Sequence, residues 1–212
     1  MQASEGAAAT SAATAVAVVR AANVHRHERT YSLITAAIGL VLGAGTTLLV
    51  RAGLVPLAAA PLTGSTLAWE VLVYVLLFDG YFYALHRLLH TRLLYRHIHS
   101  VHHRSTSPTL LTALAFHPVE ALAIMGFMPV AMFLIPIHLG SLVVVSCFLS
   151  GSIALAHCGY EVFPRWIHKV PVLNWYVTPR VHDEHHKRRN CNYAATLSIF
   201  DRAFRTLRRD EA

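Results

Sequence analysis

The sequence His86-Arg87-Leu88-Leu89-His90 is followed, after eight further residues, by His99-Ser100-Val101-His102-His103. A third group, His182-Asp183-Glu184-His185-His186, repeats the spacing of the second. Residues three and four apart share one face of an α-helix, so each group presents two or three imidazoles in one direction. Neutral imidazole is a common ligand of iron, zinc and copper. The three histidine groups therefore predict a metal site.

Two further histidines are candidates for the same site. His157 ends an apolar segment at the level of the three groups, and we include it among the ligands. His117 is the weaker candidate, because capping a helix is an alternative role for it. Nine nitrogen ligands exceed what one metal ion uses, which favours two ions over a single zinc ion with three ligands. The predicted ligands are His86, His90, His99, His102, His103, His157, His182, His185 and His186.

Five histidines and all three cysteines fall outside the predicted site. His97 would point about 200° away from His99 on a shared helix. The other unassigned histidines have no partner pattern: His25, His27, His138 and His168. Cys147, Cys158 and Cys191 form no CxxC pair, so the sequence predicts neither a disulfide framework nor a cysteine-based metal site.

The composition is that of a membrane protein. The 212 residues are 55% hydrophobic and 14% charged, with a mean hydropathy of +0.46, which is too apolar for an ordinary soluble domain. Uncharged runs of about the length that crosses a bilayer as a helix recur along the chain. They cover residues 31–50, about 67 to the first histidine group, 121–137 and 139–158. We expect an all-α integral membrane protein with about four transmembrane helices, a tight turn at residues 136–138 and a helical cap that holds the dimetal site.

The distribution of positive charge predicts the orientation. Four crossings would place the N-terminus, the segment 86–117 and the C-terminal tail on one side, together with 17 of the 18 Lys and Arg residues. Only Arg51 falls on the other side. Cytoplasmic loops retain positive charge, so the histidines are expected on the cytoplasmic side of a membrane, and the Arg-rich and Ala-rich composition suggests a bacterial inner membrane. The basic charge flanks membrane spans and carries no nucleic-acid motif, so we expect no nucleic-acid partner.

The sequence also predicts a boundary and two supporting carboxylates. Residues 1–30 form the expected disordered N-terminal tail, since their first part is rich in Ala, Ser and Thr, and 31–212 form the membrane domain. Asp79 lies two helical turns before His86, where it could accept a hydrogen bond from a ligand imidazole. Glu161 lies four residues after His157 and would share its face if the helix continued.

In this order and topology, the motifs resemble those of the fatty acid hydroxylase and sterol desaturase superfamily, which are integral-membrane di-iron enzymes with histidine boxes. The resemblance covers roughly residues 79–206. Its elements are Asp79-x3-Tyr83-x2-His86-Arg87-x2-His90, the HxxHH groups at His99 and His182, His117-Pro118-x-Glu120, His157-x-Gly159-Tyr160-Glu161, and Asn192-Tyr193 with Phe200-Asp201. The resemblance adds Tyr83 and Asn192 to Asp79 and Glu161 as residues that support the ligands.

The resemblance implies an oxidoreductase that holds two iron ions and uses O2 to hydroxylate or desaturate a lipid. The lipid would be a fatty acyl chain, a sterol or a terpenoid such as a carotenoid. Two electrons would come from an external donor, a ferredoxin or a cytochrome b5 with an NAD(P)H reductase. The alternative is a histidine-rich metal-binding or metal-transport protein. A transporter should carry polar residues through the bilayer depth, whereas here they gather on one side.

Overall fold

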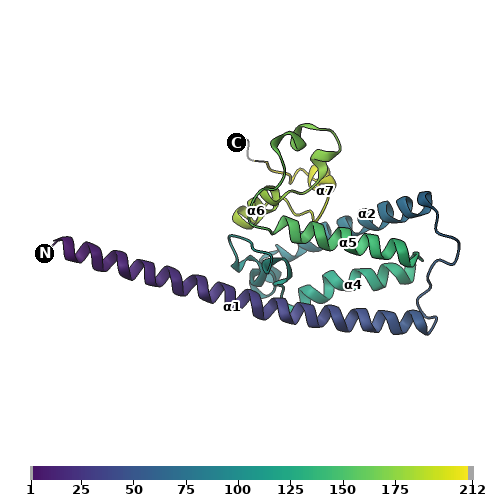
Figure 1. Ribbon diagram of the computed structural model, residues 1–212, viewed down its shortest axis with the longest axis horizontal. Coiled ribbons are helices and arrows are strands. Elements are labelled where there is room, and N and C mark those ends of the chain that lie inside the picture. Colours follow the sequence, from purple (N-terminus) through teal and green to yellow (C-terminus); the bar gives the residue numbers. More distant parts are fainter. Residues whose placement is uncertain (1, 210–212) are drawn as a thin grey trace.

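The computed structural model describes the backbone of residues 2–209 and the side chains of residues 21–209. This part of the chain is helical, and no strand is found in it. Its four long helices are α1 (Gln2–Arg51), α2 (Gly64–Leu89), α4 (Pro118–Leu134) and α5 (Leu139–Ala156). α4 packs on α1 and α2, and α5 packs on α2, so the four helices form one bundle (Figure 1).

Three of these helices are long and apolar enough to cross a membrane. They are the part of α1 from Ala21 to Arg51, α2 and α5, while α4 is a shorter apolar helix of 17 residues. Large apolar side chains point outward from the bundle, among them Leu40, Trp69 and Leu134 with 75%, 66% and 70% exposure. An outward apolar surface of this kind is suited to lipid. The expected all-α membrane architecture is confirmed.

Local signals fix the ends of the membrane helices. Thr63 precedes α2, and its side chain accepts a hydrogen bond from the amide of Thr66, which caps the helix. α4 begins at Pro118, a favourable first residue because its missing N–H would have no partner there. Only four residues, 135–138, separate α4 from α5, so the tight turn expected there is present.

A cap of short helices covers one end of the bundle. It contains α3 (Arg92–His97), α6 (Pro179–Arg188), α7 (Ile199–Ala203) and the 3-10 helices η1 (His99–Arg104), η2 (Thr112–Leu114), η3 (Arg165–Lys169) and η4 (Leu173–Trp175). The second histidine group was expected on an α-helix, but it lies on η1. The backbone breaks at Ile98, with φ −123° and ψ −69°, so His97 and His99 lie on different helices and the angle expected between them does not apply.

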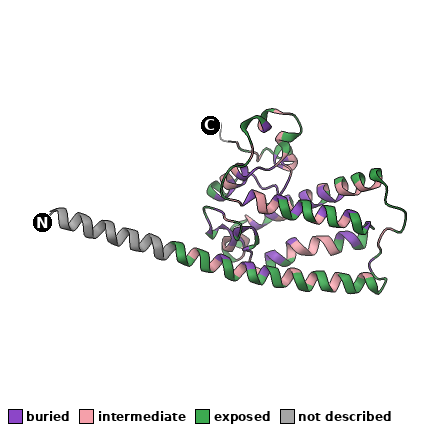
Figure 2. Cartoon of the chain, in the orientation of Figure 1, coloured by how far each residue is buried: buried purple, intermediate pink, exposed green. Residues whose placement is uncertain are grey.

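Part of the segment expected to form the N-terminal tail, residues 1–30, contacts the rest of the chain. α1 is helical from Gln2, in keeping with the high helix propensity of its many alanines. Glu28 is buried against the cap segment 105–112 and belongs to the folded domain. In Figure 2, the described part of α1, residues 21–51, is mostly exposed, with buried positions where it meets the rest of the chain. The side chains of residues 1–20, the other part of the expected tail, lie outside the description.

Candidate metal centre

The structure brings the nine predicted ligands together as two adjoining groups. The first group, called site A, contains His86, His90, His99, His103 and His185. The second group, called site B, contains His102, His157, His182 and His186. Within each group the ligand nitrogens lie within 4.8 Å of one another. The rings of His102 and His103 both pack on the ring of His186, with a centroid distance of 4.7 Å in each case. Because His103 belongs to site A and His186 to site B, the two sites are in direct contact.

Four elements meet to build the two sites. α2 supplies His86 from its last turn, and His90 follows the helix end as its cap residue. η1 supplies ligands to both sites, and α6 does the same. His157 is the residue that follows α5. These four elements come together at the cap, and so residues far apart in sequence converge here.

In five of the nine imidazole rings, a hydrogen bond determines which ring nitrogen carries the proton. Nδ1 of His86 lies 2.7 Å from the carbonyl oxygen of Tyr193, and Nδ1 of His185 lies 2.7 Å from that of Cys191. A carbonyl oxygen only accepts, so each Nδ1 must carry the proton and donate it. His157 and His186 donate in the same way to the carbonyls of Ile153 and Ser105, and His99 donates to Glu120.

The inner nitrogens therefore face one another as lone pairs. The Nε2 atoms of His86 and His99 are 3.0 Å apart, although both rings already bear their proton on Nδ1. In site B, Nε2 of His182 lies 2.9 Å from Nε2 of His157. The neutral rings of His86 and His99 have no proton to share on these atoms, so their lone pairs repel unless a cation lies between them. The donor set fits a metal ion that binds imidazole nitrogen.

Burial keeps these imidazoles in the neutral form that metal binding requires. The pKa values of His102, His182 and His185 lie well below the usual value for histidine. The main cause is loss of hydration on burial, and the second is the charge of the neighbouring imidazoles. Burial also lowers the pKa of His90 to about 3. A ligand histidine must be deprotonated to bind a metal, so the shifts favour ligation over protonation.

Glu120 is a supporting residue that the sequence analysis did not assign. Its Oε1 accepts the proton of His99 Nδ1 at 2.7 Å, and both side chains are buried. A carboxylate on the outer nitrogen of a ligand histidine fixes the tautomer and orients the ring. The motif His117-Pro118-Val119-Glu120 could have indicated this role, because Pro118 starts α4 and places Glu120 in its first turn.

His117 itself belongs to neither site. Its Nδ1 accepts a hydrogen bond from the amide of Val119 at 3.3 Å, so it caps α4. This is the alternative role considered for it.

Two expected supporting carboxylates contact no ligand histidine. Asp79 is buried, but it accepts hydrogen bonds from the amides of Thr196 and Leu197 and from the Thr196 hydroxyl, not from His86. It anchors the segment after α6 to α2. Glu161 is exposed and accepts from the amides of Phe163 and Arg180. α5 ends at Ala156, so Glu161 does not share a helix face with His157.

Tyr83 and Asn192 hold the C-terminal segment of the cap. The hydroxyls of Tyr83 and Thr206 are 3.0 Å apart, and the Tyr83 ring stacks on Phe204. The Asn192 amide donates to the carbonyls of Val181 and Arg208, and its oxygen accepts from the Arg208 amide. Asn192 thereby ties α6, which carries three ligands, to the chain that follows α7. Both residues support the site at a distance.

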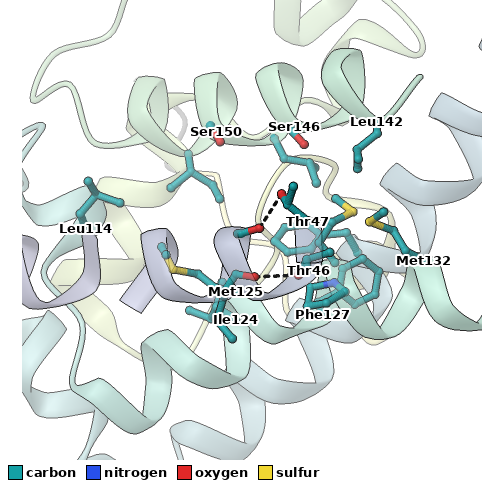
Figure 3. Close-up of a pocket in the computed structure, with 18 of the residues that line it drawn as sticks. Thr46, Thr47, Leu114, Ile124, Met125, Phe127, Met132, Leu142, Ser146 and Ser150 are labelled. Carbon is teal, nitrogen blue, oxygen red and sulfur yellow. Dashed lines mark hydrogen bonds between the residues drawn. The ribbon is translucent and has the colours of Figure 1, made fainter. Parts of the chain in front are cut away.

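A large apolar cleft adjoins the histidines. It lies between α1, α4 and α5, has a volume of about 1040 Å³, and is lined by residues such as Met125 and Leu142 (Figure 3). A second, small cavity is lined by five of the predicted ligands, with Glu120 beside them. Three apolar residues line both spaces, namely Phe116, Ile124 and Ile153. These three residues separate the membrane cleft from the candidate metal centre.

Comparison with known proteins identifies the family. The fatty acid hydroxylase family model matches residues 71–206, which include all nine histidines, Glu120 and the cap from α3 to α7. The chain belongs to the fatty acid hydroxylase family. α1 lies outside the matched region, although it lines the cleft and contacts the cap. No solved structure matches the chain significantly.

Several curated proteins are similar to this fatty acid hydroxylase domain. Methylsterol monooxygenase 1 of Gallus gallus is 36% identical over 60% of this chain and 42% of its own length. Cholesterol 25-hydroxylase of Rattus norvegicus is 34% identical over 68% of this chain and 48% of its own. A very-long-chain aldehyde decarbonylase of Oryza sativa subsp. japonica is 38% identical over 65% and 51%. The chain thus spans about half the length of the curated relatives it matches.

Proposed function

We propose that this protein is a membrane oxidoreductase that holds two iron ions and uses O2 to hydroxylate or desaturate a lipid. The observation that carries the proposal is the convergence of nine histidine nitrogens in two adjoining buried groups, with the unprotonated Nε2 atoms of His86 and His99 facing each other in one of them. Five nitrogens in site A and four in site B are enough for two ions. The fatty acid hydroxylase family and its monooxygenase and hydroxylase relatives support iron as the metal.

The protein residues would position the ions and exclude water. Site A would take one ion and site B the other, and when bound they would supply the activation of O2. Glu120 and the carbonyls of Tyr193, Cys191, Ser105 and Ile153 hold the outer nitrogens and so fix the ring orientations. The apolar side chains at the mouth of the small cavity keep it dry, which protects a reactive centre from side reactions.

Both hydroxylation and desaturation of the lipid by O2 require two external electrons. In hydroxylation, one oxygen atom of O2 enters a C–H bond of the lipid and the other leaves as water, with two electrons and two protons supplied. In desaturation, the lipid loses two hydrogen atoms and both oxygen atoms leave as water. A ferredoxin or a cytochrome b5 with an NAD(P)H reductase would supply the electrons.

The cleft favours a lipid as the substrate. It opens within the membrane bundle, and most of its lining residues are apolar. The names of the relatives point to sterols and to very-long-chain aldehydes as the molecules that those proteins act on. For this chain we propose an acyl, sterol or terpenoid substrate whose target carbon passes between Phe116, Ile124 and Ile153.

We further propose that the metal centre faces the cytoplasm at a bacterial inner membrane. The Lys and Arg residues support this orientation, because all but Arg51 lie at the histidine end of the bundle or in segments joined to it. A cytoplasmic position would also give a reductase access to the cap.

A product assay tests the proposed function. The iron-loaded protein is incubated with membrane lipid, O2, NADPH and a ferredoxin with its reductase, and the lipids are analysed by mass spectrometry. We expect a mass gain of one oxygen or a loss of two hydrogens that needs every component. The control is the His86→Ala variant, which should form no product. Metal binding without any product, together with metal uptake into sealed vesicles, would support the transport alternative instead.

A further inference from the structure

The cleft between α1, α4 and α5 carries a charged side chain at only one end, while Ser146 and Ser150 of α5 line its middle part. Arg51, Thr46 and Thr47 line it near the end of α1 that is remote from the histidines, and Figure 3 shows both threonines on this helix. As far as the chain is described, the end near the histidines carries no charged side chain and is lined mainly by apolar ones. They are Leu110, Ala113, Leu114, Phe116, Ile153 and Ala154. A ligand that fits both ends would itself be polar at one end and apolar at the other.

Arg51 is the one charged residue among those that line the cleft. Among the side chains that the structure describes, none forms an ion pair with it. It is also the single basic residue expected on its side of the membrane, where the positive charge of a protein is usually low. Arg51 is exposed at the edge of the cleft, where its guanidinium can pair with an anionic group of a bound ligand, and guanidinium pairs well with a carboxylate.

The dimensions fit one lipid chain. From Gly39 to Arg51 the cleft follows α1 for twelve residues, which corresponds to about 18 Å at the rise of an α-helix. Half of the hydrocarbon core of a bilayer is about 15 Å thick, which is the depth that one leaflet's chains occupy. A single chain can therefore reach from Arg51 to the residues that border the small cavity.

We propose that the cleft binds a long-chain carboxylate with its anionic group at Arg51 and its apolar end toward Phe116 and Ile153. This inference rests on the proposed function, because it states which part of the substrate reaches the metal centre. It predicts that oxidation takes place toward the chain end remote from the carboxylate. Lipids that lack an anionic group would bind more weakly.

Photocrosslinking tests the direction of the ligand without metal or donor. Purified protein is irradiated with either of two long-chain fatty acids, which carry a diazirine at the methyl end or next to the carboxylate. We expect the methyl-end probe to label peptides that contain Phe116 or Ile153, and the other probe to label the peptide with Thr46 and Arg51. The reverse pattern, or labelling outside the cleft, would overturn the proposal.

Binding to variants tests the role of Arg51. Arg51→Gln should weaken binding of the fatty acid at least tenfold and leave its methyl ester unaffected, whereas Arg51→Lys should retain most of the affinity. Arg92→Gln, which changes an exposed arginine outside the cleft, is the matched control. Equal binding of the acid to wild type and Arg51→Gln would overturn the proposal. Correct probe labelling without any oxidised product would instead count against the proposed function alone.

Discussion

Oε1 of Glu120 lies 2.7 Å from Nδ1 of His99, and both side chains are buried where site A meets the small cavity. The carboxylate can only accept from this nitrogen, so Nε2 of His99 keeps its lone pair for a metal ion. Within site A, Nε2 of His99 faces that of His86 at 3.0 Å and that of His103 at 3.1 Å. Glu120 therefore sets the orientation of the His99 ring, whose Nε2 faces two other predicted ligands of site A.

Glu120→Gln should weaken metal binding at site A about 10-fold to 100-fold, the usual effect of losing a carboxylate behind a ligand histidine. The glutamine has nearly the same shape, so the fold should persist. Competitive titration with a chelating dye, with Glu161→Gln as the matched control, measures the effect. If both variants bind metal as wild type does, Glu120 does not orient His99.

Glu28 should tie α1 to the candidate metal centre. Its carboxylate accepts from Ser105 at 2.6 Å and from Thr112 at 2.7 Å, and the carbonyl of Ser105 accepts from Nδ1 of ligand His186. Glu28→Ala would leave two hydroxyls without their acceptor, at a cost of about 1–3 kcal/mol each. We expect a lower melting temperature and weaker metal binding at site B.

Arg29→Ala, an exposed change on the same helix, serves as the control for Glu28. A melting temperature unchanged in Glu28→Ala would show that these hydrogen bonds do not stabilise the fold. Loss of stability with unchanged metal affinity would limit Glu28 to a structural role.

Removal of the metal should destabilise the protein strongly. A ligand that binds only the folded state contributes about 4 kcal/mol at a concentration a thousandfold above its Kd, and the metal-free sites also regain the repulsion between facing Nε2 atoms. We expect a chelator to lower the melting temperature of the wild type and of His25→Ala alike. His102→Ala should melt lower without chelator and respond less to it. Identical behaviour of His25→Ala and His102→Ala would contradict the ligand assignment.

The proposed orientation can be tested by cysteine labelling. In a variant without Cys147, Cys158 and Cys191, a cysteine at Lys169 should react only from the cytoplasmic side. One at Thr63 should react only from the opposite side, because α2 separates it from the cap. Intact and inverted vesicles with an impermeant maleimide measure both. Labelling of the two positions from the same side would be incompatible with the arrangement of spans.

The sequence predicted what depends on local spacing and missed what depends on long-range contacts. The ligands could be read from intervals of three and four residues, and the membrane helices from uncharged runs. Glu120 escaped assignment because its partner His99 is 21 residues away. Asp79 shares a helix face with His86, but its side chain meets the backbone of Thr196, which no local pattern places there.

Two other features of the structure were not predicted. Glu161 could not share a face with His157, because the chain turns at Gly159 with a positive φ of 87° that an α-helix does not allow. The contacts of Glu28 with the cap escaped prediction because its hydroxyl donors lie some 80 residues further on.

The metal content of the purified, folded protein tests the central claim most directly. Elemental analysis per chain, on wild type and on variants that disrupt one site each, distinguishes two ions from one. We expect about two ions per chain, iron in the active protein, with His86→Ala losing one and His182→Ala losing the other. One ion or fewer in well-folded wild type grown with ample iron would contradict this claim.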